Sequence, residues 1–123
     1  MTWLLVALGG ALGAMARYAV ALVLGGSQSS FPLATFSVNV LGSFLMGVGF
    51  VFIVEKGMLP IEWRYFFMVG ALGALTTFST FSIESLSLLQ NHSWQSAAIY
   101  ISASVTASLG AVFLGVFLTE KLF

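Results

Sequence analysis

Residues 73–82 read GALTTFSTFS, and this stretch decides how the whole chain is interpreted. Between Thr76 and Phe81 it holds four hydroxyl side chains and two phenylalanines, in the middle of a long apolar run. Serine and threonine side chains offer the backbone competing hydrogen bonds, and the upstream Gly70 and Gly73 lower helix propensity. The pattern predicts a helix that is broken here; the alternative is an unbroken helix whose hydroxyls bond back to its own carbonyls.

The apolar run around this stretch covers residues 63–89, and three more runs cover residues 3–24, 32–54 and 96–118. Each run is near the roughly 20 residues that a helix needs to cross the hydrocarbon core of a membrane. Barrel strands are excluded because they alternate in hydropathy and these runs do not. The connecting loops are short, so consecutive helices must be antiparallel neighbours. We therefore expect an all-α membrane protein in which residues 1–123 form a single transmembrane domain of four helices.

The composition excludes several other classes of protein. Of the 123 residues, 59% are hydrophobic and 7% are charged, whereas a soluble domain carries about 25% charged residues. The formal net charge is zero, so nothing indicates a nucleic-acid partner. Cysteine is absent, which excludes disulfides, thiolate metal sites and thiol catalysis. The single histidine, His92, falls in a loop and no nucleophile–base pair is evident, so we do not expect an enzyme.

Cationic residues are few and give the membrane orientation only a weak bias. Lys56, Arg64 and Lys121 lie on the side shared by the two termini. The turn-forming loop of residues 25–30, GGSQSS, and the loop after the third helix carry no Lys or Arg. This small bias leaves room for insertion in both orientations. The alternative is a single orientation with cytoplasmic termini.

A break inside a span points to ion transport. A broken helix in lipid frees carbonyl and N–H groups, and it is tolerated only where protein or a cavity covers it. Transporters place ions at such breaks. Phe78 and Phe81 are three residues apart and share a face if the segment is helical. Their positive ring edges favour an anion; the alternative is that both pack against lipid or core.

Donors of hydrogen bonds also occur inside other spans. Asn39 is the only amide within a span and shares a helix face with Thr35 and Ser43 at a spacing of four residues. Its two N–H groups suit an anion; the alternative is a role in joining helices. The fourth run carries a hydroxyl stripe that serves either purpose, formed by Tyr100, Ser104 and Ser108.

Two charged residues lie away from the ends of their spans, where charge is costly and usually functional. Glu84 follows the predicted break and either accepts hydrogen bonds or carries a proton. Arg17 lies in the last third of the first run. It either snorkels to the interface or attracts anions at a vestibule.

Small residues repeat at a spacing of four along several spans. Gly9 and Gly13 form a GxxxG pair, and Ser43 with Gly47 repeats the spacing. Such strips let helix backbones approach closely in lipid. Four short helices enclose little interior, so a pathway is easier to build between two copies of the chain.

Three motifs together resemble the Fluc/CrcB family of fluoride channels, over nearly the whole chain. They are residues 9–18 (GGALGAMARY), residues 35–44 (TFSVNVLGSF), and residues 73–82 followed by Glu84. The third motif is highly specific and the other two support it. The resemblance implies an antiparallel, dual-topology homodimer in the lipid bilayer, with two pores and a central structural sodium ion.

The resemblance also implies roles for particular residues. Sodium would be held by the backbone carbonyls of Gly73 and Thr76, and Arg17 would be the base of the vestibule. One departure is Ala74, where the family often has a second glycine. Fluoride is a small anion with a tightly held water shell, so its pore needs strong donors and no full positive charge. The expected pore residues are Asn39, Thr77, Phe78, Ser79, Phe81, Ser82, Tyr100, Ser104 and Ser108, with Thr80 and Glu84 in support.

The function implied by the resemblance is passive export of fluoride from the cytoplasm across a bacterial plasma or inner membrane. HF enters uncharged and leaves fluoride behind in the more alkaline cytoplasm, so a channel driven by the membrane potential lowers intracellular fluoride and gives resistance. The leading alternative is a small proton-coupled multidrug exporter that uses Glu84. A structural subunit of a larger membrane complex is a second alternative.

Overall fold

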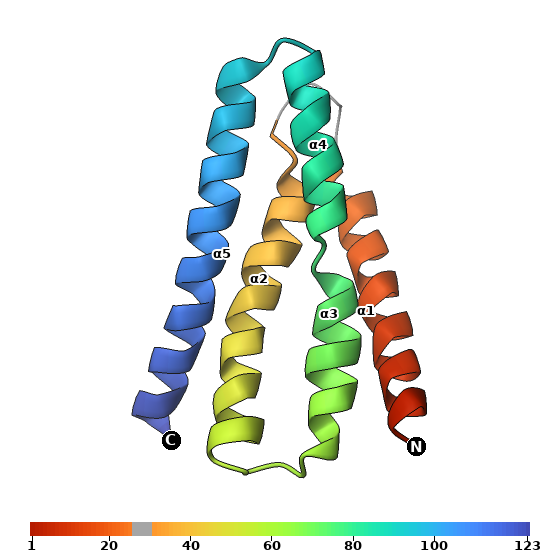
Figure 1. The fold of residues 1–123 in the computed structure, drawn as a ribbon, viewed down its shortest axis with the longest axis vertical. Helices are drawn as coiled ribbons and strands as arrows, with labels where there is room; N and C mark the ends of the chain where they lie inside the picture. The colour runs from red at the N-terminus through yellow and green to blue at the C-terminus, as the bar shows by residue number, and fades with distance from the viewer. Residues whose placement is uncertain (26–30) are drawn as a thin grey trace.

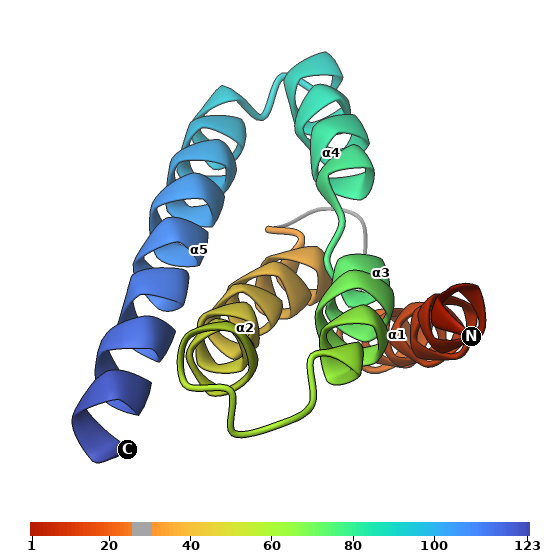
Figure 2. The same ribbon diagram turned by 60° about the horizontal axis from the view of Figure 1, so that its bottom comes forward.

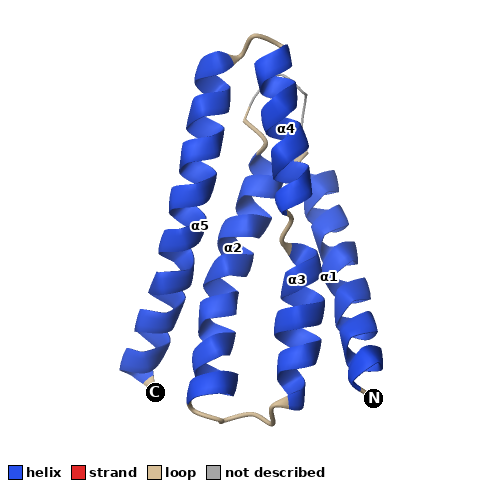
Figure 3. Cartoon of the chain, in the orientation of Figure 1, coloured by secondary structure: helices blue, strands red, loops and turns tan. Residues whose placement is uncertain are grey.

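The structure, a computed structural model, describes residues 1–25 and 31–123. Residues 26–30, most of the first predicted turn, lie outside the described part. The described residues form helices joined by loops, with no strand among them (Figure 3). Four helical segments are long and apolar enough to cross a membrane: Thr2–Leu24, Leu33–Glu55, Arg64–Gln90 and Trp94–Leu122. The predicted class, an all-α protein with four membrane-spanning helices, is confirmed.

The helices follow one another up and down the bundle, and both chain ends lie at the same end of it (Figure 1). The first span is α1 (Thr2–Leu24), and the second is α2 (Leu33–Gly49), continued by the π-helical η1 (Phe50–Glu55). The third span runs through the π-helical η2 (Arg64–Leu72), the short α3 (Gly73–Leu75) and α4 (Phe78–Gln90). The fourth is α5 (Trp94–Leu122).

Glycines set the closest approach between helices. A Cβ atom at Gly9 would overlap the carbonyl oxygen of Phe66, and one at Gly13 would overlap that of Ala71. The backbone of α1 therefore lies directly against η2 and α3, as the turned view shows (Figure 2). The same arrangement joins α2 to α5, where a Cβ at Gly47 would overlap the carbonyl of Val112. Close backbone packing of this kind is how helices associate in lipid, where no hydrophobic force drives them together.

We expect Gly9→Ala to destabilise the bundle, because the added methyl group has no space beside the carbonyl of Phe66. Overpacking of this kind costs roughly 1–3 kcal/mol. Unfolding in mixed micelles, followed by circular dichroism, measures the change. Gly10→Ala is the matched control, since a Cβ there meets nothing within 4 Å. Equal stability of the two variants would contradict the proposed role of Gly9.

Candidate functional site: a polar cavity beside extended threonines

Two threonines separate the helical parts of the third span. Thr76 (φ −79°, ψ 151°) and Thr77 (φ −152°, ψ 117°) are extended between α3 and α4. The hydroxyl of Thr76 donates to the carbonyl of Leu72 at 2.8 Å, at the end of α3. The hydroxyl of Thr77 accepts from the backbone N–H of Thr80 at 3.2 Å and so caps the start of α4. The side chains thus make the local bonds that compete with a continuous helix.

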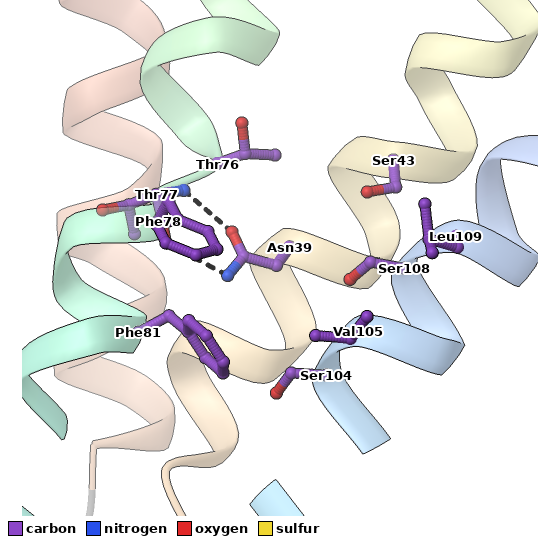
Figure 4. A pocket seen from close by; sticks show the side chains of 10 residues that line it. All are labelled: Asn39, Ser43, Thr76, Thr77, Phe78, Phe81, Ser104, Val105, Ser108 and Leu109. Carbon is purple, nitrogen blue, oxygen red and sulfur yellow. Dashed lines mark hydrogen bonds between the residues drawn. The ribbon is translucent and has the colours of Figure 1, made fainter. Parts of the chain in front are cut away.

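Asn39 of α2 pairs with the backbone of Thr77 through two hydrogen bonds (Figure 4). Its Nδ2 donates to the carbonyl of Thr77 at 3.1 Å, and its Oδ1 accepts from the N–H of Thr77 at 2.8 Å. The backbone groups of the extended threonine are therefore satisfied inside the membrane, as they must be. Because the N–H of Thr77 needs an acceptor, the amide atom that faces it must be the oxygen of Asn39. The second N–H of the Asn39 amide takes no part in these two bonds.

A cavity of about 330 Å³ lies beside this pair, between α2, α4 and α5 (Figure 4). Six of the predicted pore residues line it, together with Thr76, which the prediction assigned to sodium. The full lining is Asn39, Ser43, Thr76, Thr77, Phe78, Phe81, Ser104, Val105, Ser108 and Leu109. It combines amide and hydroxyl groups with two aromatic rings, and among the described residues it holds no charged side chain.

The two phenylalanines of the lining differ in their surroundings. Their ring centroids are 5.3 Å apart with an interplanar angle of 52°. Phe81 is 8% exposed and packs 5.3 Å from the ring of Tyr100, in a buried cluster with Leu88 and Ala97. Phe78 is 76% exposed, although it also lines the cavity. One ring is thus fixed by packing within the chain, and the other is left uncovered by it.

Two buried hydroxyls on α5 have no hydrogen-bond partner among the described residues. They are the Oη of Tyr100 and the Oγ of Ser104, whose residues are 0% and 5% exposed. Buried polar groups are nearly always paired, so such exceptions call for an explanation. Ser104 lines the cavity, and a ligand held there would supply its missing partner.

Other predicted pore residues bond locally. Ser82 donates to the carbonyl of Phe78 at 2.9 Å, and Ser79 and Thr77 have their hydroxyl oxygens 3.3 Å apart. The hydroxyl of Thr77 donates to that of Thr80 at 3.0 Å. None of Ser79, Thr80 and Ser82 lines the cavity described above. A pore role for these hydroxyls stays a prediction.

Glu84 on α4 is bound by Thr35 on α2, whose hydroxyl donates to its Oε1 at 2.5 Å. Thr35 is buried at 8% exposure. The bond joins the second span to the third. The spacing of Thr35, Asn39 and Ser43 placed Thr35 on the polar face of its helix, but nothing in the sequence indicated its partner.

Arg17 lines a second cavity, of about 270 Å³, on the α1 side of Thr77. Its Nε donates to the carbonyl of Ala74 at 3.0 Å. Thr77 and Thr80 also line this cavity, and Thr77 is common to both cavities. Sequence reasoning missed Ala74 as a partner because a backbone carbonyl leaves no mark on residue type. It also missed Val105 and Leu109, since apolar lining residues look like any others in a span.

Backbone carbonyls are the candidate ligands for a cation. Among the described residues, no group of three or more His, Cys, Asp or Glu side chains is placed to hold a metal. In a continuous helix the N–H of Thr77 would bond to the carbonyl of Gly73, and that of Thr80 to the carbonyl of Thr76. The N–H of Thr77 instead donates to Asn39, and that of Thr80 donates to the hydroxyl of Thr77. Those two carbonyls are thereby released from their usual donors.

This fold and site define a multi-pass α-helical protein of the cell membrane, with a cavity between its helices that is lined by amide, hydroxyl and phenyl groups. The family model described as CrcB-like protein, Camphor Resistance (CrcB), matches residues 4–116. The chain therefore belongs to the CrcB family, and the predicted membership is confirmed.

Three curated relatives are similar to this chain along almost their whole length. A fluoride-specific ion channel FluC of Saccharophagus degradans is 60% identical over 98% of this chain and 90% of its own. A protein of the same name from Hahella chejuensis is 52% identical over 94% of this chain and 91% of its own. A third, from Magnetococcus marinus, is 46% identical over 89% of this chain and 90% of its own.

Proposed function

We propose that this chain forms a fluoride-selective channel that exports fluoride passively from the cytoplasm. Relatives named as fluoride-specific ion channels support it at up to 60% identity. The observation that carries the proposal is the cavity in which Asn39, held by the backbone of Thr77, lies together with the unpartnered hydroxyl of Ser104. HF enters cells uncharged and releases fluoride in the alkaline cytoplasm, so a passive path driven by the membrane potential gives resistance.

The chemistry of the cavity suits a small anion that must give up its water. Amide and hydroxyl donors replace the hydration shell, and the edges of the two phenyl rings carry positive potential. Conduction also requires that the ion leave, which favours several weak contacts over one strong charge. Among the described residues, the lining offers donors without Lys or Arg.

A proton-coupled exporter of cationic drugs fits the site less well. Such a protein needs its carboxylate at the substrate, whereas Glu84 is bound by Thr35 and is absent from the described lining of the 330 Å³ cavity. The cavity instead gathers donors, which attract anions.

Fluoride efflux from liposomes that contain only the purified protein tests the proposal. An ion-selective electrode records the flux after a potassium ionophore removes the opposing voltage. We expect rapid fluoride release and little chloride release. Chloride release at a similar rate, or exchange of drug for protons with no fluoride flux, would reject the channel.

We also propose that the channel is an antiparallel, dual-topology homodimer with two pores. Phe78 is 76% exposed although it lines the cavity, and a second copy would cover it. The loops carry only a weak cationic bias: Lys56 and Arg64 lie near one end of the bundle, and the α4–α5 connection at the other end has no Lys or Arg. Such a weak bias is compatible with insertion in both orientations.

Single cysteines give the orientation directly, because the natural chain has none. We expect Met58→Cys, 51% exposed in the loop between η1 and η2, to label from both sides of the membrane in roughly equal amounts. Asn91→Cys, at the opposite end of the bundle, should behave alike. A membrane-impermeant maleimide applied to intact and permeabilised cells measures the two fractions. Labelling of each site from one side only would exclude dual topology.

A structural sodium ion at the dimer centre is the third part of the proposal. The carbonyls of Gly73 and Thr76 from both copies would hold it, since both are released from their helical donors. Oxygen ligands suit a hard cation, and unpaired carbonyls in a dry site are costly. Its part would be to join the two copies.

We expect exchange of sodium for potassium, at constant ionic strength and throughout purification, to loosen the dimer and slow fluoride efflux. The loss of these carbonyl contacts costs several kcal/mol in a dry site. Thermal unfolding in detergent measures dimer stability independently of flux, and sodium returned to the sample should restore both. Indifference of both readouts to prolonged sodium removal would defeat the assignment.

A further inference from the structure

We propose that Arg17 is a positioning residue whose Nε–H caps the carbonyl of Ala74 and thereby fixes the end of α3 beside the extended threonines. The bond is 3.0 Å long and joins residues 57 positions apart. This role differs from that of a vestibule charge, in which the guanidinium acts by attracting anions. The inference concerns the same site as the proposed fluoride pathway and rests on that function for its flux readout.

The first support is the fate of the Ala74 carbonyl. In a continuous helix it would accept from the N–H of Phe78, but the extended conformations of Thr76 and Thr77 interrupt that ladder. Carbonyls at a helix end need another donor, most of all where water is excluded. Arg17 is that donor, and a cation is also favoured at the C-terminal end of a helix dipole.

The second support is the register of the two helices. One turn before Arg17, a Cβ at Gly13 would overlap the carbonyl oxygen of Ala71, which lies one turn before Ala74. The close contact sets the height of α1 against η2, which α3 continues, and the hydrogen bond follows it one turn further along. Arg17 therefore reaches Ala74 from a backbone that is held in place.

The third support is that Arg17 does not line the cavity beside Asn39. Arg17 lines the 270 Å³ cavity with Thr77 and Thr80, and the described lining of the 330 Å³ cavity does not include it. It therefore makes no direct contact with an anion beside Asn39, and its hydrogen bond acts on that site through the backbone of residues 74–77. Arg17 thus supplies a donor to the carbonyl of Ala74, whereas the carbonyls of Gly73 and Thr76 are without their helical donors.

Two substitutions separate the donor from the charge. In Arg17→Gln, the amide nitrogen is as many bonds from the backbone as Nε, so a neutral side chain keeps the N–H donor at that place. In Arg17→Lys, a methylene group occupies that place, so the charge stays, the N–H donor at the position of Nε is lost, and the remaining donors lie one bond further out. Arg17→Met removes both and sets the baseline.

Fluoride efflux from liposomes is measured for wild type and all three variants, with size-exclusion chromatography to report assembly. We expect Arg17→Gln to keep flux near that of wild type and Arg17→Lys to fall towards Arg17→Met, roughly tenfold or more lower, as for a lost hydrogen bond to a charged group. The proposal is equally supported if Arg17→Lys fails to assemble while Arg17→Gln assembles and conducts fluoride.

Flux in Arg17→Lys that equals or exceeds that in Arg17→Gln would overturn the proposal, as would a glutamine variant that neither assembles nor conducts. Absence of fluoride flux in the wild-type protein would instead reject the channel function itself, so the two failures are distinct.

Discussion

Replacing Asn39 by aspartate should lower fluoride flux by roughly a hundredfold while leaving the shape of the side chain almost unchanged. A carboxylate keeps the acceptor for the N–H of Thr77 but cannot donate to its carbonyl, so two oxygens would face each other where a 3.1 Å hydrogen bond exists. The remaining donor towards the cavity is lost as well, and a negative charge beside the path repels the anion. A change of about 3 kcal/mol corresponds to roughly a hundredfold loss of rate.

Asn91→Asp is the matched control, because Asn91 is exposed at the end of α4 and takes no part in the cavity. Its flux should equal that of wild type in the same liposome assay. Substantial fluoride flux in an assembled Asn39→Asp variant would remove Asn39 from the pathway.

Gly42→Ala should also slow transport, by displacing the extended segment at Thr76. A Cβ at Gly42 would overlap the Cγ2 methyl of Thr76. That methyl cannot rotate away freely, since the hydroxyl on the same carbon donates to the carbonyl of Leu72 at 2.8 Å. We expect flux to fall roughly tenfold or more, because overpacking costs about 1–3 kcal/mol and displaces the neighbouring backbone.

The compensating variant makes this test specific. Thr76→Ser removes the methyl and keeps the hydroxyl, so Gly42→Ala combined with Thr76→Ser should regain most of the flux. Gly110→Ala is the control, since a Cβ there meets nothing within 4 Å. Loss of flux that the serine substitution leaves unchanged would show that Gly42 acts elsewhere.

The spans could be predicted from the sequence because hydropathy is a local property that needs no knowledge of the fold. The ends of the spans were harder to predict. The fourth run was expected over residues 96–118, whereas α5 extends over Trp94–Leu122. Polar residues at a membrane boundary continue a helix as readily as they end it, so composition alone does not mark the last turn.

The site was predictable where spacing carries the information. A stripe with a period of four residues placed Ser104 and Ser108 on one face, and both line the cavity. The pairs that hold the site depend on tertiary structure instead. Asn39 meets Thr77 across 38 positions, and Arg17 meets a backbone carbonyl that any residue type would offer. Spacing also placed Phe78 and Phe81 on one face, yet it could not show that the chain covers only one of them.

The common location of both chain ends has a consequence for joining two copies into one polypeptide (Figure 1). Because the four spans return the chain to its starting side, a short soluble linker between the end of one copy and the start of the next would force both into the same orientation. An antiparallel concatemer needs one additional membrane-crossing helix in the linker. A pair of such fusions, with and without that helix, would therefore commit the duplicated channel to one arrangement or the other.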